Sequence, residues 1–132
     1  MKFLLDTHIW LWSLIDPGRL APKVAREIEH PENELWLSPI SVWEFLVLVE
    51  KKRLAVDREP EAWLRQVFDR APLIEAPVNT EVAIATRDIG LPHRDPADRF
   101  IAATARVFGL MLVTADERMF APKGVRVLKN KG

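Results

Sequence analysis

The sequence contains no cysteine among its 132 residues. This absence excludes disulfide bonds, zinc sites built from thiolates and a cysteine nucleophile, and it fits a reducing compartment such as the cytoplasm. Long hydrophobic runs are also missing. The densest run, Phe45–Val49, is far too short to cross a bilayer, and only Phe3–Leu5 separates Lys2 from Asp6, which is too short for a signal-peptide core. We therefore expect a soluble cytoplasmic protein with no membrane partner.

An excess of charge of either sign is absent as well. The 19 lysines and arginines balance the 19 aspartates and glutamates, so the formal net charge is zero. Net charge then attracts neither nucleic acids nor membranes, and a polyanionic partner would have to be bound by a local basic patch. Hydrophobic residues make up 48% of the chain, which argues against disorder. The length predicts a single domain, residues 1–132, with a core of its own.

Short apolar runs that do not alternate with polar residues are separated by helical patterns. Strands are expected at Phe3–Leu5, Leu35–Leu37, Leu73–Ile74, Met111–Val113 and Val125–Leu128, and helices at Ile9–Ile15, Pro22–His30, Ile40–Arg53, Glu61–Arg70, Thr80–Asp88 and Pro96–Phe108. This pattern predicts an α/β fold with a mostly parallel sheet of four or five strands. In such folds ligands bind beyond the carboxyl ends of the strands.

Two acids lie where the helix 96–108 is expected to begin. Asp95 is a good N-cap, Pro96 suits the first helical position, and Asp98 falls in the first turn, where an acid interacts favourably with the helix dipole. The two carboxylates could serve only to begin this helix. A further role depends on whether other acids reach the same place.

Three other acids follow predicted strands, and each has a purely structural alternative. Asp6 comes directly after the first strand, where it could simply cap the next helix, as the adjacent threonine could too. Glu44 lies in the helix after the second strand and could close a capping box with Ser41. Asp116 follows the fourth strand and could lie in the first turn of a capping box that starts at Thr114.

Glu44 is the acid that capping explains least well. Ser38–Pro39 supplies a better start for its helix, which leaves Glu44 as a charge between Trp43 and Phe45. A lone acid among aromatic side chains needs a partner or a metal ion.

The predicted fold would draw four of these acids, Asp6, Glu44, Asp98 and Asp116, into one cleft. Clustered carboxylates raise one another's pKa unless a cation neutralises them. Oxygen ligands without cysteine or a histidine pair favour Mg²⁺ or Mn²⁺, and such sites typically hydrolyse phosphodiesters. A polyanionic substrate also needs nearby cations.

Two arginines flank the acids in the sequence and are candidates for that role. Arg94 and Arg99 are the predicted substrate-binding residues, and the basic tail Lys129–Lys131 could add contacts. Two histidines, His8 and His93, also lie close to the acids in the sequence. Near an acidic cleft a histidine is more often a hydrogen-bonding loop residue than a general base, and both roles stay open for His8 and His93 at this point.

Four segments, in this order and over nearly the whole chain, resemble one family: MKFLLDTH at 1–8, SVWE at 41–44, HRDPADRFIAATA at 93–105 and LVTADERM at 112–119. They are similar to PIN domains, and specifically to VapC-type toxins of toxin–antitoxin pairs. The resemblance implies a three-layer α/β/α sandwich and a metal-dependent endoribonuclease that uses Mg²⁺ or Mn²⁺ to cut RNA. It also implies a homodimer and a cognate antitoxin whose tail occupies the acidic cleft.

The resemblance assigns roles to individual residues. Asp6, Glu44, Asp98 and Asp116 match the acidic quartet of the family, which is both catalytic and metal-binding. Asp95 matches an additional acid and Thr114 a hydroxyl position near the metal, and Thr7 joins them as a second-rank candidate.

Two other functions remain open at this point. A haloacid-dehalogenase type of phosphotransferase also uses an aspartate after its first strand, but it usually has a second aspartate where this chain has His8. A non-catalytic RNA- or protein-binding module would use its acids only as helix caps. The apolar helices around Trp10 and Trp12 and over Val42–Val49 would bind a partner protein under either interpretation.

Overall fold

The computed structural model describes residues 1–132, and its centre is a five-stranded sheet in which every pairing is parallel. The strand order is β3-β2-β1-β4-β5. The strands are β1 (Lys2–Leu5), β2 (Glu34–Leu37), β3 (Ile74–Glu75), β4 (Met111–Thr114) and β5 (Val127–Lys129). The prediction of a parallel sheet is confirmed. The last strand begins at Val127 rather than at Val125, because the pairing with β4 starts there.

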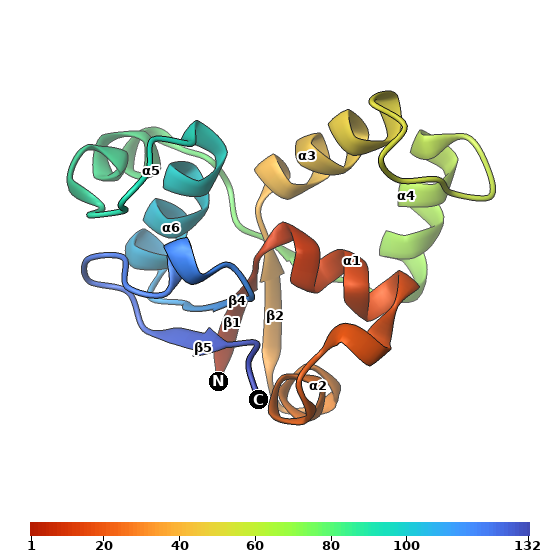
Figure 1. The fold of residues 1–132 in the computed structure, drawn as a ribbon, viewed down its shortest axis with the longest axis horizontal. Coiled ribbons are helices and arrows are strands. Elements are labelled where there is room, and N and C mark those ends of the chain that lie inside the picture. The colour runs from red at the N-terminus through yellow and green to blue at the C-terminus, as the bar shows by residue number, and fades with distance from the viewer.

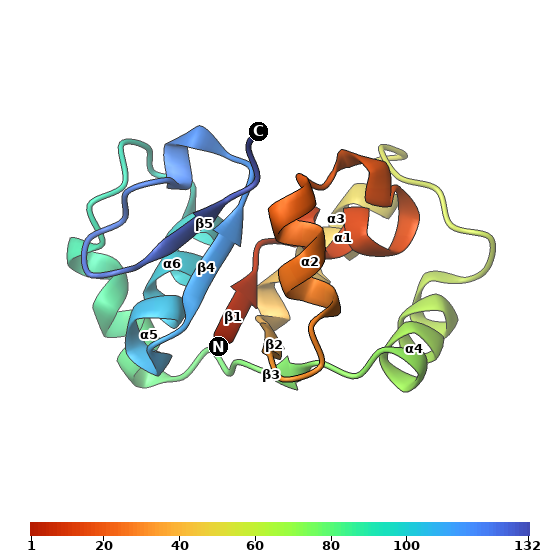
Figure 2. The ribbon, with the colours of Figure 1, turned by 90° about the horizontal axis from the view of Figure 1, so that it is seen from below.

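Six helices cover the two faces of the sheet. They are α1 (Thr7–Ile15), α2 (Pro22–Glu29), α3 (Pro39–Glu50), α4 (Pro60–Arg70), α5 (Thr80–Ala85) and α6 (Pro96–Phe108), with short 3₁₀ turns at Pro17–Arg19, Thr86–Asp88 and Glu117–Met119. Helices α5 and α6 lie on one side of the strands and α1 to α4 on the other (Figures 1 and 2). The expected three-layer sandwich is therefore confirmed. None of the helices has both the length and the apolar character needed to cross a membrane.

Successive residues of β1 face different cores, which explains why the apolar runs do not alternate with polar residues. Leu4 packs with Leu112 and Ile101 in the core beneath α5 and α6. Its neighbours Phe3 and Leu5 pack in the second core, which is formed with α1 to α4. All three β1 side chains are almost completely buried. A parallel strand covered on both faces has no polar face to present to water.

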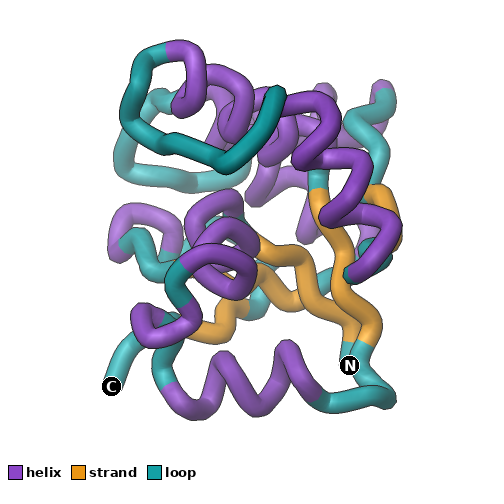
Figure 3. Tube along the Cα trace, turned by 90° about the vertical axis from the view of Figure 1, so that its right-hand side faces the viewer, coloured by secondary structure: helices purple, strands orange, loops and turns teal.

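The chain winds in two directions from β1, and this places the site. It first moves outward through β2 to β3, and then crosses to β4 on the other side of β1 and continues to β5. The strand order therefore reverses between β1 and β4, and ligands of open α/β sheets bind in the crevice at such a point. Figure 3 shows the strands surrounded by helices and loops. The carboxyl ends of β1 and β4, with Asp6 and Asp116 just beyond them, meet at this crevice.

Candidate active site

Asp6 is held between two neighbouring strands and a helix start. Its Oδ1 accepts a hydrogen bond from the amide of Thr7 at 2.9 Å, which makes Asp6 the N-cap of α1. Its Oδ2 accepts a hydrogen bond from the hydroxyl of Thr114, the last residue of β4, at 2.6 Å. The expectation that Thr7 could cap α1 is therefore wrong, because Thr7 is already inside the helix and its hydroxyl points elsewhere.

The Thr7 hydroxyl instead joins α1 to α3. It donates to Oε1 of Glu44 at 2.5 Å and lies 2.8 Å from the hydroxyl of the buried Ser41. The amide of Ile40 donates to Oγ of Ser38 at 3.0 Å, so Ser38 is the N-cap of α3. The capping-box alternative for Glu44 is therefore wrong, and Glu44 projects toward α1 rather than back to its own helix start.

Asp95 and Asp98 stand at the start of α6 as the sequence predicts. Oδ1 of Asp95 accepts a hydrogen bond from the amide of Ala97 at 3.0 Å, while Asp98 lies in the first turn and is buried. Nε2 of His93 lies 2.6 Å from Oδ2 of Asp98, and Nδ1 of His93 is buried without a hydrogen-bond partner. This arrangement favours the proton on Nε2, from which His93 donates to the carboxylate. His93 is thus a hydrogen-bonding loop residue.

Asp116 begins the 3₁₀ turn after β4 and pairs with an arginine that the sequence analysis missed. Oδ1 of Asp116 accepts from the amide of Arg118 at 3.0 Å, and the Arg118 guanidinium reaches Oδ2 at 2.9 Å. The amide of Asp116 donates to the Thr114 hydroxyl at 3.1 Å. Asp116 itself is therefore the cap of this turn, and the capping box starting at Thr114 is wrong. The only local signal for Arg118 was its place two residues after the acid.

These side chains line one cavity of about 320 Å³. Its wall contains five carboxylates, those of Asp6, Glu44, Asp95, Asp98 and Asp116. The other lining residues include a single arginine; they are Thr7, His8, Trp12, Ala115 and Arg118. The structure thus brings the four predicted acids together with the second-rank candidate Asp95. Thr114 stands behind Asp6 rather than in the wall.

Burial and mutual repulsion raise the pKa of three of these acids. Burial raises the pKa of Asp6 and of Asp98, and the charges of neighbouring carboxylates add to both effects. For Glu44, burial raises the pKa to about 7, with further contributions from Asp6, Asp98 and Asp95. Hydrogen bonding from Arg118 has the opposite effect and holds the pKa of Asp116 below its usual value. The cavity therefore carries more negative charge than its single arginine neutralises.

The chemistry of this donor set fits a hard divalent cation. Carboxylate oxygens line the cavity, the chain has no cysteine thiolate, and a bound cation would neutralise the carboxylate repulsion that adds to the effect of burial on the pKa values. In the present arrangement no three acidic or histidine side chains are grouped closely enough to hold one ion. His93 contacts Oδ2 of Asp98 and Arg118 contacts Asp116, so each of these two carboxylates has a side-chain partner within the protein.

The predicted substrate-binding arginines lie beside this cavity rather than in it. Arg94 and Arg99 line a second cavity of about 590 Å³, together with Arg87, Leu91, Pro92 and His93. Nη2 of Arg99 donates to the carbonyl oxygen of Thr86 at 2.6 Å. In the basic tail, the Lys129 ammonium lies over the ring of Phe120, 5.1 Å from its centre.

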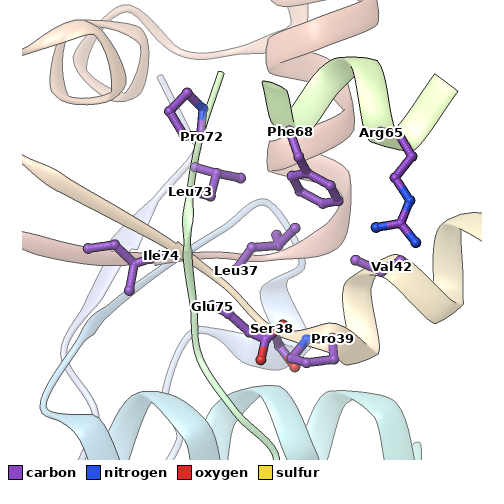
Figure 4. Close-up of a pocket in the computed structure, with 10 residues that line it drawn as sticks. All are labelled: Leu37, Ser38, Pro39, Val42, Arg65, Phe68, Pro72, Leu73, Ile74 and Glu75. Carbon is purple, nitrogen blue, oxygen red and sulfur yellow. The ribbon is translucent and has the colours of Figure 1, made fainter. Parts of the chain in front are cut away.

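A third cavity, of about 390 Å³, contains none of the five acids and is lined in part by apolar side chains. It lies between the end of β2, the start of α3, α4 and β3 (Figure 4). Phe68 of α4, Leu37 of β2 and Leu73, which directly precedes β3, face it.

Comparison with known proteins identifies the family. Residues 3–124 match the PIN domain. The chain belongs to the PIN-domain family. This PIN domain is 34% identical over 119 residues to Ribonuclease VapC22 of Mycobacterium tuberculosis, and the match covers 88% of each chain. The predicted resemblance to VapC-type proteins is therefore confirmed.

Solved structures show the same PIN fold over almost the whole chain. A structure of VapBC2 from Rickettsia felis bound to a promoter DNA fragment matches with a TM-score of 0.72 and 17% identity, and covers 98% of each chain. DNA-bound VapBC from Salmonella typhimurium matches with a TM-score of 0.68 and 22% identity, again over 98% of each chain. At these identities the likeness supports the fold alone.

Proposed function

We propose that this PIN domain is a Mg²⁺- or Mn²⁺-dependent endoribonuclease that hydrolyses RNA phosphodiester bonds and acts as the toxin of a type II toxin–antitoxin pair in the cytoplasm. The observation that carries the proposal is the cavity with five carboxylates at the point where the strand order of the sheet reverses. The identity of 34% to a protein named as a ribonuclease supports the same activity.

Asp6, Glu44, Asp98 and Asp116 would hold the ion, with Asp95 beside them. A divalent ion supplies an activated water and stabilises the charge that develops on the phosphoryl oxygens. The remaining residues fix the carboxylates. Thr114 orients Asp6 and Thr7 orients Glu44, in each case through a hydroxyl that donates to the carboxylate.

His93 and Arg118 contact the other two acids. His93 bonds to Asp98 and Arg118 to Asp116, so these two carboxylates are also oriented by neighbouring side chains. Arg118 is more than half exposed and lines the acidic cavity, which leaves its guanidinium able to turn toward a substrate phosphate.

Helix capping alone, which the non-catalytic alternative requires, explains only part of this arrangement. Asp6, Asp95 and Asp116 do cap helices or turns. Glu44 and Asp98 cap nothing, and their raised pKa values show that their charges are held at a cost to stability. Destabilised charges of this kind are typical of functional sites.

The nuclease proposal is tested by incubating the antitoxin-free protein with a mixed pool of tRNA and rRNA in EDTA, in Mg²⁺ and in Mn²⁺. Asp6→Asn and Asp98→Asn are compared with the parent protein, because asparagine still caps α1 and both changes keep the side-chain size. We expect metal-dependent cleavage that both substitutions abolish while circular dichroism shows an intact fold. A folded parent protein that cuts no RNA with either metal would refute the proposal.

The same chain would bind a cognate antitoxin and a second copy of itself. One solved structure that shares the fold, from Klebsiella pneumoniae, is described as a toxin–antitoxin complex, which supports this assignment. Trp43 and Leu46 on α3 are 55% and 40% exposed, and a large apolar side chain at such exposure favours a protein interface. Light scattering on the purified chain measures the dimer, and a monomer at all concentrations would exclude it.

A further inference from the structure

Two cavities of opposite charge adjoin one another at His93. The acidic cavity has five carboxylates in its wall, while the second cavity has three arginines, Arg87, Arg94 and Arg99, and no acid. His93 lines the second cavity and contacts Asp98, which lines the first. We call the second cavity the arginine cavity. A strand of RNA that lies across the acids therefore reaches a basic hollow directly beside them.

The charges of the arginine cavity are left uncompensated by the protein. Arg87 and Arg94 are exposed and take part in no ion pair. Asp88, the acid next to Arg87, is instead held by Arg106 at 2.7 Å and by Lys123 at 3.8 Å. Like charges gathered around one hollow repel each other, and an anion in the hollow would relieve this repulsion.

The Arg99 side chain bonds to neighbouring backbone instead of extending freely into solvent. Its guanidinium donates to the carbonyl oxygens of Thr86 at 2.6 Å and of Arg87 at 3.5 Å. These bonds attach the 3₁₀ turn that carries Arg87 to α6, the helix that carries Asp98. Arg99 is thus a positioning residue that fixes Arg87 relative to the acids.

We propose that the arginine cavity binds a backbone phosphate of the RNA next to the bond that is cut, with Arg87 and Arg94 as the contacting groups. This inference rests on the proposed nuclease function. Guanidinium groups suit the ligand, because their planar arrangement of donors matches phosphate oxygens. Only two of the six lining residues, Leu91 and Pro92, lack a charged or ionisable side chain, so an apolar ligand finds little surface here.

The test measures RNA binding without cleavage. Fluorescence anisotropy follows a fluorescein-labelled oligouridylate in EDTA over a series of salt concentrations, for the parent protein and for the double variant Arg87→Gln/Arg94→Gln. The matched control is Lys23→Gln/Arg26→Gln, which removes the same charge from exposed positions on α2, across the sheet from α5 and α6 (Figure 2). A backbone contact is independent of base sequence, so a single RNA is sufficient.

Each phosphate contact to single-stranded RNA contributes about 0.7 to the slope of log K against log salt. We expect the cavity variant, which loses one phosphate contact, to lose about 0.7 of this slope and to bind about fivefold more weakly at about 0.1 M salt, while the control stays close to the parent. Equal losses in both double variants, or none in either, would overturn the proposal. Weaker binding of polyglutamate with unchanged binding of oligouridylate would assign the cavity to an acidic protein segment and would also overturn it.

A second substrate separates this inference from the nuclease proposal itself. Bis(p-nitrophenyl) phosphate has one phosphodiester and no neighbouring phosphate, so with Mn²⁺ the cavity variant should lose several-fold less kcat/KM on this substrate than on RNA, where its KM rises. A parent protein that hydrolyses neither substrate refutes the nuclease proposal. A parent that cleaves RNA, with a cavity variant of unchanged KM and unchanged binding, refutes only the arginine cavity.

Discussion

Replacing Glu44 with glutamine should stabilise the metal-free protein at alkaline pH. Burial raises the pKa of Glu44 from 4.5 to about 7, and the charges of Asp6, Asp98 and Asp95 add to this effect. At a pH between 4.5 and about 7, Glu44 of the folded protein holds a proton that the unfolded chain has already released. The contribution of Glu44 to the free energy of unfolding is therefore present at low pH and is lost as the pH rises from about 5 to about 8.

The size of the effect follows from the pKa difference. A shift from 4.5 to about 7 corresponds to about 3 kcal/mol. Glu44 is only partly buried, so screening by solvent reduces the expected value to about 2 kcal/mol. Glutamine has the same size and still accepts the hydrogen bond from the Thr7 hydroxyl, so the substitution removes the charge without removing the contact.

Urea unfolding in EDTA at pH 5 and at pH 8 measures this difference. We expect Glu44→Gln to match the parent at pH 5 and to exceed it by about 2 kcal/mol at pH 8. Glu50→Gln is the control, since it removes one exposed carboxylate from the end of the same helix. A Glu44→Gln protein no more stable than the parent at pH 8 would refute the claim that burial and neighbouring carboxylates destabilise the charged form of Glu44.

Three further predictions concern stability. Thr114→Val removes the hydroxyl that donates to Asp6 and accepts from the amide of Asp116, so urea unfolding should show a loss of about 2 kcal/mol. Thr114→Ser keeps the hydroxyl and should restore this stability, and equal losses in both variants would contradict the role of the hydroxyl. Gly109 ends α6 with φ +66°, so Gly109→Ala should lower the unfolding free energy by about 1 kcal/mol, and an unchanged value would show that the left-handed conformation is not required. Mg²⁺ at about 100 times the parent's Kd should stabilise the parent by about 2.7 kcal/mol in thermal unfolding but Asp6→Asn by about 1.4 kcal/mol or less; an equal gain in both proteins would place the ion elsewhere.

Much of the site was predictable because the fold class places strand ends together. Once the short apolar runs indicated a parallel sheet, the residues directly after β1 and β4 had to meet at one edge, and Asp6 and Asp116 do so. The place of Asp98 was predictable from the local sequence, since Asp95–Pro96 is a strong signal for the start of α6. At these positions the local sequence signals and the strand order of the sheet indicated the same site.

Side-chain direction was less predictable, because it depends on partners distant in the sequence. Thr7 was expected as a possible cap, but its hydroxyl bonds to Glu44, which is 37 residues away. Arg118 was missed because an exposed arginine in a turn carries no signal until the acid beside it is known to line a cavity. Arg99 was expected to face the substrate, and its contact with the Thr86 carbonyl depends on how α5 packs on α6. None of these contacts follows from periodicity.

The central claim is that the acids hold a divalent ion together, and calorimetric titration of Mn²⁺ into the metal-free protein tests it most directly. We expect binding that tightens as the pH rises through about 7, where Glu44 loses its proton. Asp6→Asn and Asp98→Asn should each weaken this binding by about tenfold or more, which corresponds to about 1.4 kcal/mol. A folded parent protein that takes up no Mn²⁺, or variants that bind it as tightly as the parent, would contradict the account.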